Sequence, residues 1–478
     1  MRLFIIILFL FSTKLLGAQM NATEPKPTRA QLAWHDMEFY LFAHFGPNTF
    51  TDLEWGHGNE KEEVFNPTDL DCDQWCGIAK AAGAKGIIIT AKHHDGFCLW
   101  PSKYSTHTVR ESKWRNGQGD VLKELSASCK KYGLKFGVYL SPWDRNHPAY
   151  GTDQYNDVFA NMLTEIFTNY GPIWELWWDG ANGEGPNGKK QVYDFNRFEK
   201  LIRTLSPNTI IFSDIGPDIR WVGNEKGIAG KTDWNLLDTA GFMRGAGAPP
   251  TDTLNTGNKF GKNWIPAECD VSIRPGWFYH KKEDTLVKSP EQLFDLYLKS
   301  VGRGACFLLN VPPDGRGLFT TYDSTALVDF KNLISQNLGT NISRKGHGYF
   351  NMQSTKRFTS KLNDGKGLTY EPVDFPFVQS MGLAFRSSQK INCIVLKENI
   401  ANGQHCAEFT IKLLGPKQEF IREINGTTIG HKRILTFPAT EVSHIVLSIN
   451  DQKKQTQVSE IESYLIDENL VEKQIPNE

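Results

Sequence analysis

The sequence lacks an excess of charge of either sign. Its 53 Lys and Arg residues balance 54 Asp and Glu residues, which leaves a formal net charge of −1. A chain built to bind nucleic acid or an anionic membrane surface carries a marked positive excess, so both functions are disfavoured. Hydrophobic residues make up 40% of the chain and charged residues 22%, which is typical of a folded globular protein.

Long apolar runs are missing beyond the N-terminus. No stretch of about 18 apolar residues follows residue 18, so we expect no transmembrane helix. The chain starts with a basic residue, a short apolar run that ends at Phe11, and small residues up to Ala18. This pattern predicts a secretory signal peptide over residues 1–18. We therefore expect a secreted or periplasmic protein.

Cysteine motifs for metal binding are absent as well. The eight cysteines form no C-x-x-C pair and no ladder with histidines, so we expect no zinc site. Several of them, such as Cys306, lie in apolar stretches and are interpreted as buried thiols. The one disulfide considered, between Cys393 and Cys406, would bridge neighbouring strands in an oxidising compartment. The oligomeric state is not indicated by any pattern.

Aromatic residues are the one compositional excess, at 12% of the chain with 13 Trp, 14 Tyr and 30 Phe. Flat apolar rings beside polar groups suit the C–H faces of carbohydrates. Rings also fill the core of any large domain. Composition alone therefore leaves a sugar site and simple core packing as equal alternatives.

Short apolar runs alternate with amphipathic stretches over the first two thirds of the chain. The expected strands are residues 39–45, 86–91, 135–140, 173–178, 209–213, 264–267 and 305–311, and the expected helices are 72–82, 120–132, 154–170, 192–205 and 290–301. Runs without polar alternation favour parallel strands buried on both faces. Because no G-x-G-x-x-G fingerprint follows the first strand, a (β/α)8-like barrel is favoured over a dinucleotide-binding sheet.

Three regions follow from these patterns. The signal segment precedes a barrel domain over residues 27–340, and a second domain covers residues 341–478. Short alternating segments between Gly, Asn and Lys turns predict an all-β sandwich for the second domain. Within the barrel, residues 215–263 are Gly-rich without periodicity and are expected to form a long functional loop.

The expected strand ends carry polar or aromatic side chains. These are His44, His93, His94, Tyr139 and Asp179. Active sites of (β/α)-barrels are built at the carboxyl ends of the strands, so these residues are candidates for one site.

Asp179 closes an aromatic strand and is followed by a glycine. Hydrolysis of a glycosidic bond requires a second carboxyl group on the other side of the scissile bond. Glu225, beside Trp221 in the long loop, and Glu268, at a strand end, are the two candidates, and their spacing does not separate them. Taken singly, each acid also fits a helix cap or a solvated loop.

His93 and His94 are adjacent, and neighbours on a strand point to opposite faces. Without a third ligand at suitable spacing, hydrogen bonding to sugar hydroxyls is favoured over metal binding, so we expect no metal and no cofactor. His44 would join them from the neighbouring strand, and Glu54 with Trp55 would close that side of the site.

Several of these stretches resemble the retaining α-L-fucosidases of glycoside hydrolase family 29. They are FAHFG at residues 42–46, AKHHDGF at 91–97, FGVYLS at 136–141, WWDG at 177–180 and WVGNE at 221–225. The resemblance covers residues 30 to 340 and implies a (β/α)-barrel of irregular form followed by a β-sandwich. It also implies a fucosylated oligosaccharide as the substrate.

The resemblance assigns roles to the candidate residues. Asp179 matches the nucleophile, and Glu225 matches the proton donor of the branch that acts on α-1,3- and α-1,4-linked fucose, which favours Glu225 over Glu268. Residues that match contacts to fucose are His44, Glu54, His93, His94, Tyr139, Trp177 and Trp277, the last against the methyl group. Two alternatives stay open: a retaining glycosidase for another galacto-configured sugar, and a sugar-binding protein without catalytic activity.

Overall fold

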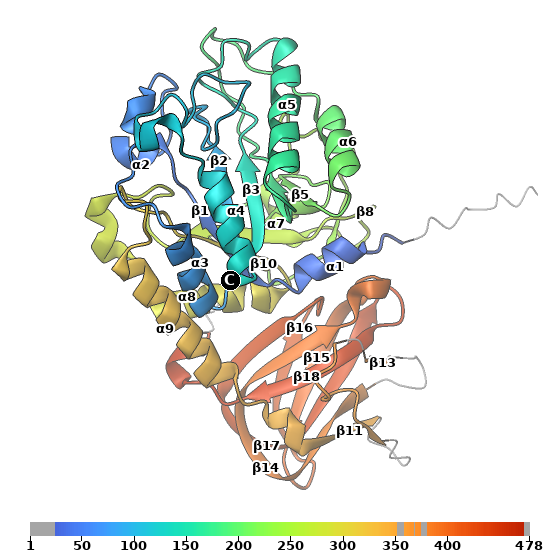
Figure 1. Cartoon of the computed structure of the whole chain (residues 1–478). Coiled ribbons are helices and arrows are strands. Elements are labelled where there is room, and N and C mark those ends of the chain that lie inside the picture. Colours follow the sequence, from blue (N-terminus) through green and yellow to red (C-terminus); the bar gives the residue numbers. More distant parts are fainter. Residues whose placement is uncertain (1–23, 351–357, 368, 374–379, 473–478) are drawn as a thin grey trace, which may run out of the picture.

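The computed structural model describes residues 24–350, 358–367, 369–373 and 380–472 (Figure 1). The expected signal segment, residues 1–18, lies outside the described residues, so export stays a prediction. No helix within the described ranges combines the length and the apolar character needed to cross a lipid bilayer.

Eight parallel strands close into a barrel in the order β1-β10-β9-β6-β5-β4-β3-β2. They are β1 (Phe39–Ala43), β2 (Gly86–Lys92), β3 (Lys135–Leu140), β4 (Glu175–Trp177), β5 (Ile210–Ser213), β6 (Ile219–Trp221), β9 (Ala267–Ser272) and β10 (Cys306–Asn310). Every residue of β1 and β2 is buried, which explains their unalternating sequences. The predicted barrel is confirmed.

Helices cover the outside of the barrel (Figure 1). The helices of the described residues are α1 (Arg29–His35), which lies at the end of the barrel where the strands begin, α2 (Pro47–Thr51), α3 (Cys72–Ala81), α4 (Val121–Tyr132), α5 (Gln154–Asn169), α6 (Phe195–Leu205), α7 (Thr251–Thr256), α8 (Pro290–Lys299) and α9 (Thr321–Leu338). Side-chain caps fix several of their starts. Asp120 accepts the backbone N–H of Lys123 before α4, and Ser289 forms a capping box with Gln292 before α8.

The segment between β5 and β10 corrects two expectations. The expected strand 264–267 is wrong, because the barrel strand is β9, while β8 (Asn263–Trp264) pairs with β7 (Leu236–Leu237) in a separate two-stranded antiparallel sheet. The expected loop 215–263 contains the barrel strand β6 and the helix α7. Only residues 214–218 join β5 to β6, which leaves no room for a helix, so the alternation of helices and strands breaks there.

The interior of the barrel is filled with side chains. The cluster contains Trp34, Met37, Tyr40, Phe42, Ile88, Tyr139, Trp177, Ile210, Phe212, Ile219, Cys306 and Leu308. Trp34 comes from α1 and closes the end of the barrel where the strands begin. Alternate residues of each barrel strand supply such a core in layers, so open space is left only at the carboxyl ends.

The C-terminal domain is antiparallel, as predicted. Its strands are β11 (Gly346–Phe350), β12 (Phe358–Thr359), β13 (Glu371–Pro372), β14 (Ser380–Glu398), β15 (Cys406–Leu414), β16 (Phe420–Gly426), β17 (Arg433–Gln452) and β18 (Gln457–Tyr464). The pairing of β14 with β17 shifts register between Ala384 and Gln389, where the long strands bend. Both halves of these strands contribute to one apolar core, and the strands of the domain form one eight-stranded antiparallel sheet.

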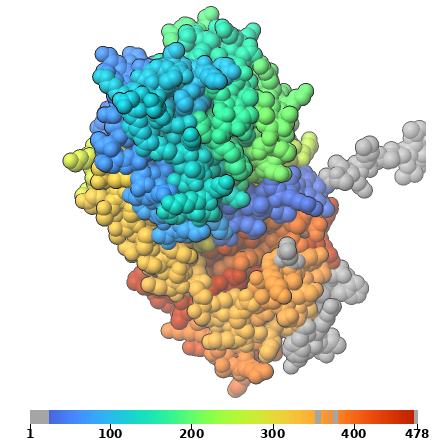
Figure 2. All heavy atoms as spheres, in the orientation of Figure 1, coloured from blue at the N-terminus to red at the C-terminus, as the bar shows by residue number. Residues whose placement is uncertain are grey.

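The antiparallel domain packs against the end of the barrel where the strands begin (Figures 1 and 2). Glu38, just before β1, forms an ion pair with Lys432, and Arg303, before β10, lies 2.9 Å from the carboxylate of Glu472. Figure 2 shows the two domains in contact along a continuous seam. The carboxyl ends of the barrel strands therefore face away from this domain.

All eight cysteines are buried and carry free thiols. The disulfide considered between Cys393 and Cys406 is wrong. Cys393 lies in β14 opposite Thr436 and Tyr464, whereas Cys406 begins β15. The interpretation of Cys306 as a buried thiol is confirmed.

Candidate active site

A recess of about 200 Å³ opens at the carboxyl ends of the barrel strands. It is lined by all ten residues expected from the sequence, which are His44, Glu54, Trp55, His93, His94, Tyr139, Trp177, Asp179, Glu225 and Trp277, together with Phe42, Ala181 and Asp270. Sites for drug-sized ligands span roughly 300–1,000 Å³, so this smaller recess suits a single sugar ring.

The parallel strands bring these residues together from distant parts of the chain. His44 follows β1, His93 follows β2, Asp179 follows β4, and Glu225 follows β6. Because all strands of the barrel run in the same direction, their carboxyl ends meet at one rim. Glu225 therefore follows the carboxyl end of a barrel strand, as the other candidates do, although the sequence did not predict strand β6.

Asp179 is held by donors on both carboxylate oxygens. The backbone N–H of Ala181 donates to Oδ1 at 2.7 Å, and the Tyr139 hydroxyl donates to Oδ2 at 3.2 Å. A Cβ atom on Gly180 would lie 2.0 Å from a carboxylate oxygen of Asp214, so any larger residue after Asp179 would force the Asp214 side chain to move. The side chain stays 25% exposed, which leaves the fixed carboxylate open to the recess.

Three buried histidines line the recess, and Nε2 of His94 lies 3.9 Å from Oδ2 of Asp179. Burial lowers the pKa of His44 to about 3 despite its hydrogen bond to Asn310, and burial lowers the pKa of His94 to about 4 despite the charge of Asp179. Burial also lowers the pKa of His93 well below its usual value. All three rings are neutral near pH 7, so each has one donor and one acceptor nitrogen, and Nδ1 of His44 uses its donor on Oδ1 of Asn310.

The Nδ1 atom of His93 is buried and has no hydrogen-bond partner in the described part of the chain. A buried polar nitrogen without a hydrogen bond destabilises the fold unless a ligand or a water molecule bonds to it. We therefore interpret this nitrogen as a contact point for a polar group of a ligand. No group of three or more His, Cys, Asp and Glu residues within the described ranges is arranged to hold a metal ion.

Two tryptophans, Trp55 and Trp277, form parts of the wall. Trp55 is 56% exposed and meets His94 and Trp143 edge to face, with ring centroids 5.6 and 5.7 Å away. The indole N–H of Trp277 donates to Oε2 of Glu225 at 3.3 Å. Trp277 thus joins the exposed Glu225 to the wall of the recess.

Glu54 lines the recess, yet its carboxylate is bound by the segment that carries Trp277. It accepts the backbone N–H groups of Trp277 at 2.9 Å and Phe278 at 3.3 Å, and it lies 2.6 Å from Nε2 of His280. Nδ1 of His280 contacts Asp52. Glu54 therefore supports the Trp277 wall, and His280 is a residue that sequence reasoning missed because it stands 226 positions away.

His280 makes the stability of this wall depend on pH. Burial lowers its pKa, but hydrogen bonds to Asp52 and Glu54 outweigh burial and raise the pKa above 6.5. The stabilisation is therefore complete below about pH 6.5 and is lost as pH rises through the raised pKa. We expect the wild type to melt about 2 °C above H280Q near pH 6 in thermal unfolding, and the difference to shrink at alkaline pH. A difference that stays constant with pH would contradict this role.

Glu268 lies outside the recess, which removes it as a rival proton donor. Its side chain is fully buried in the barrel interior, where it bonds Tyr40 and Trp177.

Asp270, two residues along β9, lines the recess instead and accepts the indole N–H of Trp221 at 2.9 Å. Burial and then the charge of Glu268 raise the pKa of Asp270 well above its usual range. Sequence reasoning missed Asp270, and the signal that could have found it is the alternation of two acids, Glu268 and Asp270, in β9.

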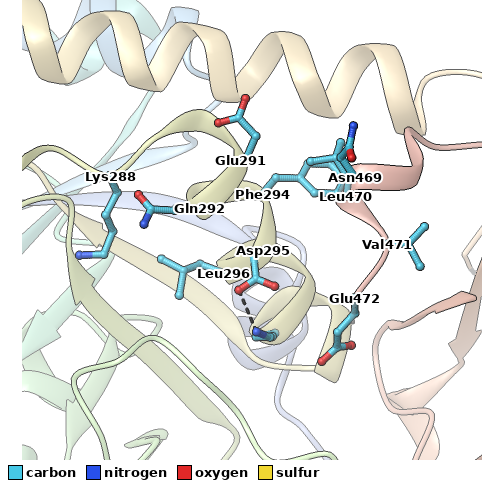
Figure 3. A pocket seen from close by; sticks show the side chains of 11 residues that line it. Lys288, Glu291, Gln292, Phe294, Asp295, Leu296, Asn469, Leu470, Val471 and Glu472 are labelled. Carbon is cyan, nitrogen blue, oxygen red and sulfur yellow. Dashed lines mark hydrogen bonds and ion pairs between the residues drawn. The ribbon is translucent and has the colours of Figure 1, made fainter. Parts of the chain in front are cut away.

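A larger hollow of about 490 Å³ lies on the outer face of the barrel, between α8 and residues 469–472 (Figure 3). Asp295 at its centre pairs with Lys299 at 2.8 Å, and Glu472 pairs with Arg303. The first pair lies within α8 and the second joins the two domains, and none of the candidate residues lines this hollow.

Comparison with known proteins gives a consistent result. A family model described as α-L-fucosidase matches residues 18–338. The chain is 42% identical over 422 residues to α-L-fucosidase 1 of Arabidopsis thaliana, covering 86% of this chain and 82% of that protein.

Two solved structures extend the likeness to the whole fold. A glycoside hydrolase 29 family member from an unknown rumen bacterium matches with a TM-score of 0.82 and 38% identity, covering 95% of this chain and 79% of that one. A family 29 fucosidase of Ruminococcus gnavus in complex with fucose matches with a TM-score of 0.82 and 29% identity, covering 96% and 99%.

Proposed function

The chain belongs to the α-L-fucosidase family, glycoside hydrolase family 29, and we propose that it removes terminal L-fucose from α-1,3 and α-1,4 linkages on branched glycans with retention of configuration. Action on a fucosylated substrate follows from the family itself. The observation that carries the proposal is that Asp179 and Glu225, from distant strand ends, line one recess of monosaccharide size.

Asp179 is the proposed nucleophile. One of its oxygens bonds to the anomeric carbon of fucose as the glycosidic C–O bond breaks, which forms a fucosyl-enzyme ester. The N–H of Ala181 and the hydroxyl of Tyr139 support this assignment, because they hold the carboxylate in one orientation before the substrate arrives.

Glu225 is the proposed acid and base. It gives its proton to the departing sugar oxygen, then takes a proton from the water that hydrolyses the ester. The two carboxyl groups of a retaining pair stand about 5–5.5 Å apart in the productive state. The contact between Trp277 and Glu225 supports the role, because it places this otherwise exposed acid at the mouth of the recess.

The neutral histidines are proposed to bind the hydroxyl groups of fucose. A neutral imidazole both donates and accepts, as a hydroxyl does, and the unpaired Nδ1 of buried His93 offers one such contact. The structure of the Ruminococcus gnavus relative contains fucose, which supports the same ligand here. The preference for α-1,3 and α-1,4 linkages rests on the WVGNE stretch at residues 221–225.

Product analysis by NMR on a fucosylated Lewis-type trisaccharide tests the function. We expect α-L-fucose as the first product, before mutarotation, and the disaccharide as the second. Aryl α-L-fucosides should be hydrolysed and the matching aryl galactosides should not. First release of β-L-fucose would overturn the retaining mechanism, and cleavage of only α-1,2-linked or α-1,6-linked substrates would overturn the linkage.

Export is also proposed, with a secreted or periplasmic location. The support is the N-terminal pattern of a basic residue, an apolar run and small residues over residues 1–18. N-terminal sequencing of the protein recovered from the host's extracytoplasmic fraction should begin close to residue 19.

A further inference from the structure

Two carboxyl groups face each other inside the barrel, below the floor of the recess. Glu175 begins β4 and Glu268 lies in β9, and both side chains are fully buried. Along β9, inward positions alternate, so Glu268 sits about 6–7 Å deeper than Asp270, which lines the recess. Neither carboxyl belongs to the proposed reaction.

The groups that contact this pair are neutral. The indole N–H of Trp34 donates to Oε2 of Glu175 at 3.2 Å. The indole N–H of Trp177 donates to Oε1 of Glu268 at 2.8 Å, and the hydroxyl of Tyr40 donates to Oε2. Two adjacent negative charges in such surroundings would be strongly unfavourable, so the pair must hold a proton.

The contacts indicate where that proton resides. Oε1 of Glu175 is buried with no hydrogen-bond partner in the described part of the chain, whereas each carboxylate oxygen of Glu268 accepts one donor. Burial and then the charge of Glu268 raise the pKa of Glu175 well above its usual range. Burial also raises the pKa of Glu268, but bonds from Glu175, Tyr40 and Trp177 oppose that effect. Because donors reach both oxygens of Glu268 but only one oxygen of Glu175, the charged form is better stabilised at Glu268, and we assign the proton to Glu175.

Trp177 connects this pair to the recess. Its ring lines the recess and stacks on Phe212 with centroids 3.9 Å apart, while its N–H points to Glu268. Tyr139 packs against the same ring at 5.4 Å and donates its hydroxyl to Asp179. A change in the orientation of Trp177 would thus move the wall of the recess and the partner of Asp179 together.

We propose that Glu268 is a positioning residue, whose carboxylate, paired with protonated Glu175, orients Trp177 and through it Tyr139 beside Asp179. An indole N–H can only donate, so it requires a fixed acceptor, and a charged acceptor binds it about twice as strongly as a neutral one. The proposal rests on the proposed function, because it takes Asp179 as the nucleophile. The expected effect of Glu268 on the affinity for fucose does not depend on the role of Asp179.

The two isosteric variants E175Q and E268Q form a matched pair. E175Q replaces a neutral O–H donor by a neutral N–H donor, so we expect kcat/KM on an aryl α-L-fucoside to stay within about threefold of wild type. E268Q removes the charged acceptor of Trp177, so we expect a loss of about tenfold, with a matching increase in the dissociation constant of L-fucose measured by calorimetry. Equal losses in the two variants, or an unchanged E268Q, would overturn the proposal.

The W177F background tests whether Glu268 acts through Trp177. Without the indole N–H, E268Q should cost less than about threefold in fucose affinity, so the two changes should be strongly non-additive. Additive losses would show that Glu268 has only a general structural role. If D179N kept full activity, the proposed function would fail, whereas the coupling between Glu268 and Trp177 in fucose binding would remain.

Infrared spectroscopy of the folded wild type tests directly whether Glu175 is protonated. This measurement does not require E268Q to fold. We expect a C=O stretch of a protonated carboxyl group at neutral pH that disappears in E175Q. Thermal unfolding of each variant verifies that it is folded under assay conditions. A wild-type spectrum identical to that of E175Q in this region would refute the shared proton.

Discussion

Replacement of Asp179 by alanine is expected to lower kcat by roughly 10⁴-fold or more on every fucoside tested, because the first bond to the anomeric carbon can no longer form. Sodium azide should restore turnover of D179A, since the small anion fits the space left by the carboxylate. The product should be β-L-fucosyl azide, because azide attacks from the face that Asp179 occupies. Kinetics with an aryl α-L-fucoside and NMR of the product measure both effects.

D179N provides the second half of this test. The amide still accepts the N–H of Ala181, and the Tyr139 hydroxyl can turn to accept the new N–H, so the local structure should survive. Its turnover should fall by the same order of magnitude without azide rescue. D214N is the matched control, because Asp214 lies beside Gly180 but does not line the recess. Near-normal activity in D179A or D179N would end the assignment.

Substitution of Glu225 by glutamine is expected to reduce activity according to the leaving group. Hydrolysis of natural glycans should fall by about 10²–10⁴-fold, because their leaving oxygen must be protonated. Aryl fucosides with acidic phenols need little protonation, so formation of the fucosyl-enzyme should be slowed far less. The intermediate should then accumulate, because Glu225 also activates the water, and a burst of phenol should become visible.

The comparison of two substrate classes is the essential measurement for E225Q. D238N is a suitable control, because Asp238 lies in the same connection between β6 and β9 but does not line the recess. It should retain wild-type rates on both classes. Equal losses of E225Q on activated and natural substrates would argue against the acid role.

Residues at the ends of fully buried, mostly apolar strands were accessible from sequence. His44, His93 and Asp179 each follow a strand whose residues are all buried, and a parallel barrel collects such ends at one rim. Glu225 was harder to place, because β6 has three residues and no helix before it. Its selection over Glu268 came from the family resemblance rather than from a periodic pattern.

The error at β9 has a physical reason. The expected strand 264–267 runs through Pro266, a residue that central strands exclude, and this was a signal against it. With β9 at Ala267–Ser272, the inward alternation of Glu268 and Asp270 becomes evident. Contacts such as that between His280 and Glu54 join positions that only the closed barrel brings together, so no local pattern predicts them.

The filled barrel core beneath the recess also limits how the enzyme can move along its substrate. A cavity that ends on Trp177 and Phe42 admits a chain terminus but cannot thread a polymer through it. This shape suits the proposed removal of terminal fucose rather than internal cleavage, and in that proposal each turnover ends with dissociation of both products. Free fucose then competes with every new chain end for the same cavity, so its accumulation should slow the trimming of a densely decorated glycan.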